Sequence, residues 1–526
     1  MDRRDDGEAV RAQWIFWAAA LVAISVAAYS IARPLTWLVR VVPDDTFYYL
    51  KIAGTIVREG RSSFDGVNTA NGYHPGWMLV VVVLAYFFHT KVALLRACLA
   101  TALLLHLAAG YGLSRFFRRW MPTDWSWIGG ACWILNPLPV LLVLEGMEAS
   151  LYVLAIVFAL WVYVTRMEPF LEEGAIPLWN MVQLGLAFGL TILARTDAVL
   201  LCAAASAALV WKLSWREGPR FAAATGATLV LTIAPWLAWC RWVGGAWLQH
   251  SGSMKLLWAS REHTAGLAAG WRYLAGNWLT FPLWARTVDR LGNRWPTARA
   301  SAGALMTLLL LVALWHGLSR RETRALARAG LVLVGGTILT GAVYGLFFTD
   351  KQDWYRAQPA LILYVVLFGV IVRGWAENHS FRRLDATVFG SAAAAVFAAT
   401  LIPVVLTANS YPWQKDVLES QPMFERLVPE GRTIGCFNAG IPAYFSPRHV
   451  VNLDGLVNNS VYPYYRRNQF ERYLRDADIE YIADEDMSLT RANLFTERHL
   501  LVESLAEVPM TWLPQVKRHL WRVDLR

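Results

Sequence analysis

Long apolar stretches separated by short charged connectors are the feature that most restricts how this chain can fold. They recur up to about residue 406 and bring the hydrophobic fraction to 56% and the charged fraction to 17%. A soluble domain carries about 25% charged residues, and no water-soluble core could bury so many apolar helices, whereas a lipid bilayer can. Many of the 27 tryptophans lie at the ends of these stretches, where amphipathic rings mark the membrane boundary. The pattern therefore predicts a mainly α, polytopic membrane helix bundle.

The net charge of +10 does not indicate nucleic-acid binding, because no basic helix with interleaved aromatic residues stands outside the apolar stretches. In a membrane protein such a charge is the cytoplasmic excess of Lys and Arg. The five cysteines have neither disulfide-framework nor metal-ligand spacing. The first apolar stretch, residues 14–32, follows a basic start and is long enough to remain as an anchor.

The apolar stretches cannot all cross the bilayer. If they did, the basic connectors after residues 114 and 319 would lie outside the cytoplasm, against the positive-inside bias. The stretches are 14–32, 77–88, 92–113, 127–144, 151–164, 178–193, 198–213, 221–239, 302–318, 330–348, 360–372 and 386–406.

Residues 77–88 are too few for a hydrocarbon core that needs about twenty residues, so we expect them to lie in the membrane interface. About eleven spans then remain, and the N-terminus and every basic connector face the cytoplasm. The outer segments are 33–91, 145–150, 241–301, 349–359 and the tail from 409. We expect the functional residues in these outer segments, on the extracytoplasmic side.

This topology divides the chain into a transmembrane catalytic domain, residues 1–408, and an extracytoplasmic soluble domain, residues 409–526. The catalytic domain has interfacial helices in its first outer loop (33–91) and a Trp-rich outer loop (241–301). The tail alternates helical runs with strand-like ones, which predicts a small α/β domain. The predicted strands lie within 432–438, 449–453, 479–483 and 518–524.

The first outer loop carries the chemistry, beginning with the adjacent acids Asp44 and Asp45. Apolar positions then recur at helical spacing until Gly60, which predicts an amphipathic helix on the membrane surface. One acid could simply cap this helix, because the helix dipole favours a carboxylate there. Two neighbouring carboxylates also raise one another's pKa, which suits a general base. Further on, His74 is a candidate ligand or phosphate contact, with a purely structural donor as the alternative.

These residues resemble bacterial membrane glycosyltransferases of the C-type (GT-C) superfamily, which includes protein mannosyltransferases, aminoarabinose transferases, arabinosyltransferases and the oligosaccharyltransferase catalytic subunit. The resemblance covers the membrane portion and is most specific in the first outer loop. It rests on the residues 44–50 (Asp-Asp-Thr-Phe-Tyr-Tyr-Leu), 71–77 (Asn-Gly-Tyr-His-Pro-Gly-Trp) and 146–148 (Gly-Met-Glu). Residues 194–198, 251–255, 354–356 and 452–458 are similar to segments of uncharacterised bacterial members.

The resemblance implies an inverting transferase of the bacterial inner membrane that uses a polyprenyl-phosphate-linked sugar and a glycan, lipid or protein acceptor. Carried onto this chain, Asp44 is the catalytic base and Asp45 the alternative or helper. Cations must then surround the phosphate. The candidates are Arg195, Lys255, Arg356 and His74, and the alternative for the arginines and the lysine is an ion pair with Asp197, Asp350 or Asp353.

Candidate residues for the acceptor or the sugar are Tyr48, Tyr73, Glu145, Glu148, Asp197 and Asp454. Glu145 and Glu148 could instead hold a metal or His74, or cap the next helix. A divalent cation (Mg or Mn) stays open, because family members differ in metal dependence. The Trp-rich loop could stack on sugar faces or lie in the interface. Its tryptophans are Trp242, Trp247, Trp258, Trp271, Trp278, Trp284 and Trp295.

Two other functions fit a polytopic chain. A transporter or a flippase of lipid-linked sugars would carry acids within its helices, often with inverted repeats. Here the acids lie in predicted loops and no repeat is visible, which favours an enzyme. A receptor or assembly subunit would leave the acidic, aromatic and basic elements of several loops unexplained.

Overall fold

The computed structural model describes residues 3–171, 175–263, 266–268, 296–320, 323–348, 352–376, 386–512 and 514–525. The chain divides into two compact units, which are treated separately. The helical unit comprises Met1–Ser30, Ala100–Ala234 and Ala265–Thr407. The mixed unit comprises Ile31–Leu99, Pro235–Thr264 and Ala408–Arg526.

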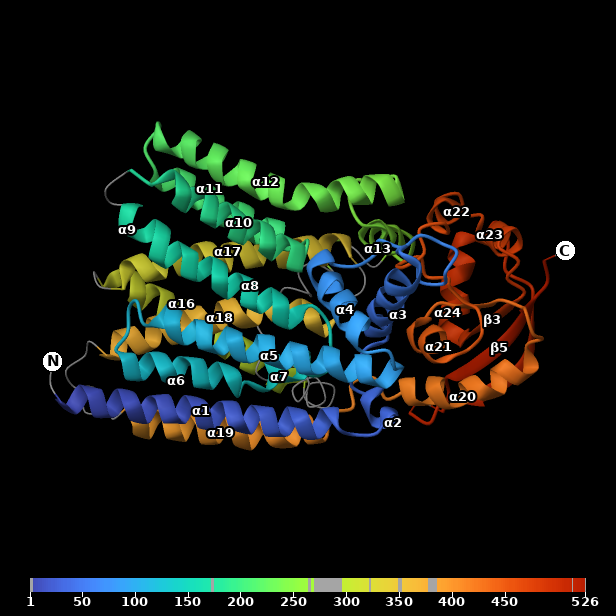
Figure 1. Ribbon diagram of the computed structural model, residues 1–526, viewed down its shortest axis with the longest axis horizontal. Coiled ribbons are helices and arrows are strands. Elements are labelled where there is room, and N and C mark those ends of the chain that lie inside the picture. Colours follow the sequence, from blue (N-terminus) through green and yellow to red (C-terminus); the bar gives the residue numbers. More distant parts are fainter. Residues whose placement is uncertain are drawn as a thin grey trace. The chain divides into compact units, whose positions relative to one another are not determined.

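The helical unit is a bundle in which α8 packs on α10, and α17 packs on both α11 and α18 (Figure 1). Two long helices, α5 (Lys91–Phe117) and α12 (Glu217–Gly244), contribute residues to both units. The other elements are α1 (Arg3–Ile31), α6 (Thr123–Ile134), α7 (Pro137–Glu145), α8 (Ala149–Val162), the π-helix η1 (Tyr163–Met167), α9 (Glu168–Leu171), α10 (Leu178–Ala194), α11 (Ala198–Lys212), α16 (Pro296–Ser319), α17 (Arg324–Phe347), the 3₁₀ helix η3 (Asp353–Arg356), α18 (Ala357–Ala376) and α19 (Ala386–Leu406).

Five helical segments of the described residues are long and apolar enough to cross a membrane, and the bent pair α6–α7 would make a sixth. They are Val10–Ile31, Lys91–Phe117, Ala149–Leu171, Glu217–Gly244 and Ala327–Phe347. Shorter apolar helices of 10–17 residues accompany them. The chain is thus an integral membrane protein with a mainly helical fold, while the figure of eleven spans stays a prediction.

The apolar stretch 127–144 forms two helices rather than one, joined at a bend of 48°. Asn136 begins the second helix, and its side-chain oxygen accepts a hydrogen bond from the Leu138 amide at 3.1 Å. Pro137 and Pro139 follow at once, and proline lacks the N–H that would continue the first helix. The bend therefore follows from local sequence that hydropathy alone does not register.

The mixed unit opens with helices of the first loop. These are α2 (Leu35–Leu38), α3 (Asp44–Glu59) and α4 (Pro75–Phe87). Helix α3 packs on α4 and on the tail helix α21 (Gly440–Phe445). Helix α4 has 13 residues, about 20 Å at 1.5 Å per residue, which is shorter than a hydrocarbon core. Helix α13 (His250–Arg261) completes the part of the unit that precedes the tail.

The tail folds around a five-stranded sheet of order β2-β1-β3-β5-β4, which confirms the predicted small α/β fold. Strands β2, β1 and β3 run parallel, and β5 joins β3 and β4 antiparallel. The strands are β1 (Ile434–Cys436), β2 (Val450–Asn452), β3 (Tyr481–Glu485), β4 (Val502–Pro509) and β5 (Lys517–Val523). The helices are α20 (Gln414–Leu427), α21, α22 (Tyr462–Arg466), α23 (Phe470–Asp476), α24 (Asp486–Ala492) and the 3₁₀ helix η4 (Asn493–Phe495).

Candidate active site

Helix α3 begins at the acidic pair for local reasons. Pro43 is extended at the N-cap, and Asp44 and Asp45 occupy the first turn, where the helix dipole favours negative charge. Gly60 ends the helix in the left-handed conformation, φ 69°, which glycine adopts without a Cβ penalty. The predicted helix and its stop are therefore both present, and the acids lie at its amino end.

The carboxylate of Asp44 binds the amino end of α21. Its Oδ2 accepts a hydrogen bond from the Gly440 amide and its Oδ1 one from the Ile441 amide, both at 2.7 Å. The contact needs glycine at 440, because a Cβ there would lie 2.2 Å from the Asp44 carbonyl oxygen and 2.7 Å from its Oδ2. Asp44 thus joins the first loop to the tail.

Asp454 lies at the carboxyl edge of the tail sheet, close to helix α3. Strands β1, β2 and β3 are parallel, so their carboxyl ends lie together, an arrangement in which α/β sheets commonly bind ligands. Asp454 follows β2, and its Oδ2 lies 3.0 Å from the Tyr48 hydroxyl, which also lies 3.1 Å from the Phe437 carbonyl oxygen after β1. Tyr48 and Asp454 are both buried. Helix α3 therefore presents two predicted residues, Asp44 and Tyr48, to this edge.

Burial raises the pKa of Asp44 to about 7, and the charge of Asp45 adds to the rise, while the amides of Ile441 and Gly440 oppose it. Burial likewise raises the pKa of Asp454 to about 7, again with a contribution from Asp45. Desolvation and a neighbouring acid are the expected causes of such shifts. Two carboxyls that titrate near neutral pH suit proton transfer.

Three segments that the sequence singled out meet beside this edge. Gly72 packs so closely that a Cβ would lie 1.6 Å from the Leu456 carbonyl oxygen and 3.3 Å from the Ser251 Cβ. Asn71 accepts a hydrogen bond from the His250 amide at 3.1 Å. A Cβ on Gly455 would lie 3.0 Å from the sulfur of Met254, on α13. The segments 71–77, 251–255 and 452–458 therefore form one packed junction.

The other first-loop candidates lie close to this junction. His74 is at the N-cap of α4, and its amide donates to the Tyr49 hydroxyl at 3.1 Å. The Tyr73 hydroxyl lies 2.8 Å from that of Ser62, and its ring packs on two tryptophans of α12. Lys255 lies on α13 and is half-buried. The mixed unit thus holds Asp44, Asp45, Tyr48, Tyr73, His74, Lys255 and Asp454.

The helical unit gathers a second cluster around Arg195. Four of the five guanidinium N–H groups are used, because Nε and Nη2 bond Asp197 at 3.0 Å, Nη1 bonds Glu148 at 2.8 Å and Nη2 bonds the Tyr344 hydroxyl at 3.2 Å. The Tyr344 hydroxyl donates to Asp197 at 2.7 Å, and the Tyr355 ring stacks on the guanidinium. The ion pair with Asp197, stated as the alternative for Arg195, is present.

Three further candidates belong to the helical unit. Glu145 ends α7 and is buried, and Arg356 ends η3 and is half-buried. Glu148 occupies the N-cap of α8, but its side chain makes no capping hydrogen bond and pairs with Arg195 instead. The capping explanation of Glu148 is therefore wrong.

Some of the loop tryptophans and the side chains of two predicted ion-pair partners fall outside the described residues. Trp271, Trp278, Trp284, Trp295 and Asp350 lie outside them, as does the side chain of Asp353. Of the remaining loop tryptophans, Trp242 and Trp247 are exposed, while Trp258 is buried beneath the Arg491 guanidinium. No group of three His, Cys, Asp or Glu side chains suited to a metal ion occurs in the described part of the chain.

Sequence reasoning missed Gly440 and the acids at the carboxyl end of β3. Asp484 is buried and accepts hydrogen bonds from the amides of Phe437 and Asn438, at 2.5 and 3.0 Å. Next to it, Glu485 pairs with the buried Arg518 at 3.3 Å. One signal was available, since two acids follow the predicted strand 479–483 directly, and the carboxyl end of a strand in an α/β sheet commonly binds ligands.

The comparisons with known proteins bear on the fold. Residues 415–520 match a family described as a domain of unknown function, DUF8728, and no curated protein matches. Among solved structures, ArnT from Cupriavidus metallidurans bound to undecaprenyl phosphate is similar, with TM-score 0.57, 13% identity and 96% of this chain and 97% of that chain covered.

The Archaeoglobus fulgidus oligosaccharyltransferase is similar too. Its apo form has TM-score 0.54 and 12% identity over 93% of this chain and 71% of that chain. A form tethered to an acceptor peptide has TM-score 0.53 and 12% identity over 92% and 70%. At such identities the likeness shows the fold alone, the GT-C membrane fold.

Proposed function

We propose that this chain is an inverting membrane glycosyltransferase that moves a sugar from a polyprenyl-phosphate donor to an extracytoplasmic glycan, lipid or protein acceptor. The observation that carries the proposal is the acidic edge of the mixed unit, where the buried Asp454 bonds Tyr48 and the half-buried Asp44, on the same helix as Tyr48, binds the amide of Gly440. The GT-C fold supports it, because the similar structures are an oligosaccharyltransferase and an ArnT bound to undecaprenyl phosphate.

In the proposed reaction Asp44 takes the proton of an acceptor hydroxyl while that oxygen attacks the anomeric carbon. The bond from this carbon to the donor phosphate breaks, and the polyprenyl phosphate leaves with the electron pair. A single displacement inverts the anomeric configuration, and the phosphate needs no strong general acid. General base catalysis contributes about 10²–10⁴-fold.

Asp44 can serve as the base while it binds α21. An ionised carboxylate has about four lone-pair sites, and the two amides occupy two of them. The amides also fix the direction of the remaining lone pairs, which general base catalysis requires. Asp45 is the alternative base, and its charge contributes to the raised pKa of Asp44 and of Asp454.

The donor phosphate needs a cation, and we propose Lys255 and Arg356 for this role, with His74 as a third candidate. Arg195 is the least available of the predicted phosphate ligands, because two carboxylates and a tyrosine already hold its guanidinium. Its proposed role is to fix the turn between α10 and α11. Asp454 and Tyr48 would orient the acceptor hydroxyl or the sugar at the carboxyl edge of the sheet.

The test uses purified protein in nanodiscs with lipid-linked sugars extracted from the host membrane, and it measures released polyprenyl phosphate and glycosylated acceptor. We expect Asp44→Asn to lower the rate about 10²–10⁴-fold with donor binding retained. Asp45→Asn should lower it less. An Asp44→Asn variant as active as the parent protein would refute the mechanism. Movement of intact donor between leaflets without transfer would identify a flippase instead.

A further inference from the structure

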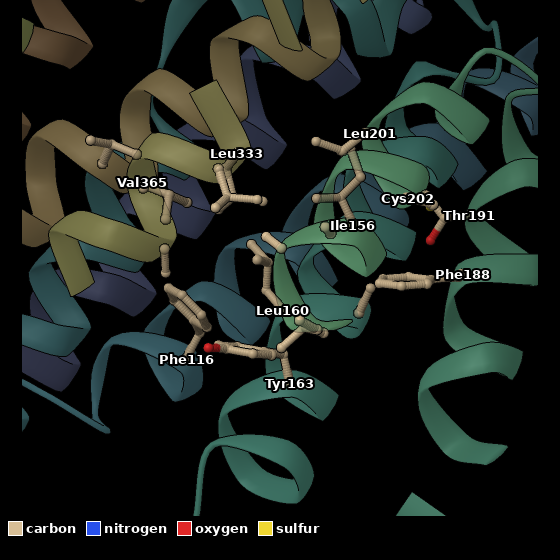
Figure 2. A pocket seen from close by; sticks show the side chains of 18 of the residues that line it. Phe116, Ile156, Leu160, Tyr163, Phe188, Thr191, Leu201, Cys202, Leu333 and Val365 are labelled. Atoms are coloured by element: carbon tan, nitrogen blue, oxygen red, sulfur yellow. The ribbon is translucent and has the colours of Figure 1, made fainter. Parts of the chain in front are cut away.

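The helical unit contains an apolar cavity of about 100 Å³ that sugar transfer does not use. It lies among α5, α8, α10, α11, α17 and α18, and Figure 2 shows hydrocarbon side chains such as Leu160, Phe188 and Leu333 around it. The space is narrow and elongated, because its lining runs along α11 from Leu201 to Lys212, roughly 16 Å at 1.5 Å per residue.

The lining excludes a polar ligand. Apart from Thr191, Tyr163 and Lys212 its side chains offer scarcely any hydrogen-bonding group, so water or a sugar would lose its partners there. An apolar cavity of about 150 Å³ stays dry and accepts a benzene-sized hydrocarbon. A few methylene groups of a lipid chain therefore match this space in size and in chemistry.

One end of the cavity carries the residues of a membrane interface. Lys212 lines it there with the amphipathic rings of Trp120 and Tyr163. Two neighbouring tryptophans, Trp211 and Trp215, are 91% and 79% exposed in the protein alone. Exposed tryptophans beside a lysine at a helix end mark the level of lipid head groups. The cavity thus runs from head-group level toward the hydrocarbon interior.

The same end carries basic side chains that have no carboxylate partner among the described residues. Arg119 pairs with Glu168 at 3.4 Å and Arg220 with Glu217 at 3.1 Å. Lys212 and Arg118 are exposed, and no carboxylate of the described residues lies within 4.0 Å of either. Basic groups at this level attract anionic lipid head groups.

We propose that this cavity holds a segment of one acyl chain of an anionic phospholipid, whose head group lies at Lys212. The site lies in a different unit from the acidic edge, so the proposal stands independently of the proposed glycosyl transfer. The bound lipid would fill a space between helices that the protein's own side chains leave open, and would thereby support the packing of α11 on α17.

The test is native mass spectrometry of the full chain after delipidation and addition of phosphatidylglycerol or phosphatidylcholine with identical acyl chains. We expect tighter binding of phosphatidylglycerol, and a preference about fivefold smaller in Lys212→Gln, since one cation near the head group is removed. Ala208→Phe, which fills the cavity, should abolish the bound lipid. Its matched control is Ala207→Phe, on the exposed side of the same helix, which should bind lipid as the parent does.

Equal lipid retention by Ala208→Phe and Ala207→Phe would overturn the site, and equal binding of the two lipids would overturn the head-group assignment. A second measurement needs no variant that could misfold. Phosphatidylglycerol with a photoreactive group on its acyl chain should label Leu160, Phe188 or Leu201, and labelling confined to exposed helix faces would overturn the proposal.

Discussion

Replacing Gly440 with alanine tests whether the contact between Asp44 and α21 holds the acidic edge together. The added Cβ would lie 2.2 Å from the Asp44 carbonyl oxygen and 2.7 Å from its Cγ and Oδ2. Real Cβ atoms do not approach so closely, and this carbonyl oxygen belongs to the backbone of α3. The start of α3 must therefore move away from α21, and the carboxylate loses its two amide donors.

The magnitude follows from two contributions. Overpacking of a close contact costs about 1–3 kcal/mol, and each hydrogen bond to a charged group contributes about 1.5–3 kcal/mol. Because the movement of α3 relieves the overpacking, the two lost hydrogen bonds set the cost, and we expect the free energy of unfolding to fall by about 3–6 kcal/mol in total. Sugar transfer should fall as well, although the carboxylate itself is retained.

The assay compares thermal unfolding and sugar transfer of Gly440→Ala with those of the parent protein in the same lipid. Gly252→Ala is the matched control, because this helical glycine of α13 has open space where the Cβ would be placed. The double variant with Asp44→Asn should lose less than the sum of the single losses, since both changes break one contact. A Gly440→Ala protein with unchanged stability and activity would refute this reasoning.

Three further predictions concern single groups. Because the pKa of Asp44 is raised to about 7, kcat/KM should increase as the pH rises through about 7, and a profile flat between about pH 6 and 8 would contradict its role as base. The native state holds this proton more tightly than an unfolded carboxyl of pKa 3.8, so the free energy of unfolding should decrease from about pH 4 to about pH 7, as denaturation curves would show. Arg195→Ala should lower the free energy of unfolding by about 3–5 kcal/mol, because it removes the cation that pairs with the buried Glu148 and the half-buried Asp197, and unchanged thermal stability would show that the ion pair is dispensable.

The sequence predicted those parts of the molecule that local chemistry determines. Helix α3 starts at its acids and stops at Gly60 as expected, and four of the five tail strands lie within or overlap their predicted runs. Strand β4 was missed because it is mostly exposed, with Glu503 and Glu507 in place of the apolar alternation that marks a strand.

Contacts between distant segments were beyond sequence reasoning. The hydrogen bonds that Asp44 accepts from the amides of residues 440 and 441 depend on how the tail packs on α3, and no local sequence pattern determines this packing. The pairing of Arg195 with Glu148 likewise joins α8 to the turn after α10, whereas its pairing with Asp197, two residues away, was foreseeable. Motif order identified the segments 71–77, 251–255 and 452–458, but only the fold brings them together.

A comparison of cell-envelope glycans tests the proposed transfer most directly. The strains are a parent, a strain lacking this chain, and that strain supplied with either the parent protein or Asp44→Asn at equal membrane levels. We predict that deletion removes one sugar from an envelope glycan, lipid or protein, and that the parent protein restores it while Asp44→Asn does not. Identical glycans in the parent and deletion strains, or full restoration by Asp44→Asn, would contradict a transferase that acts through this carboxylate.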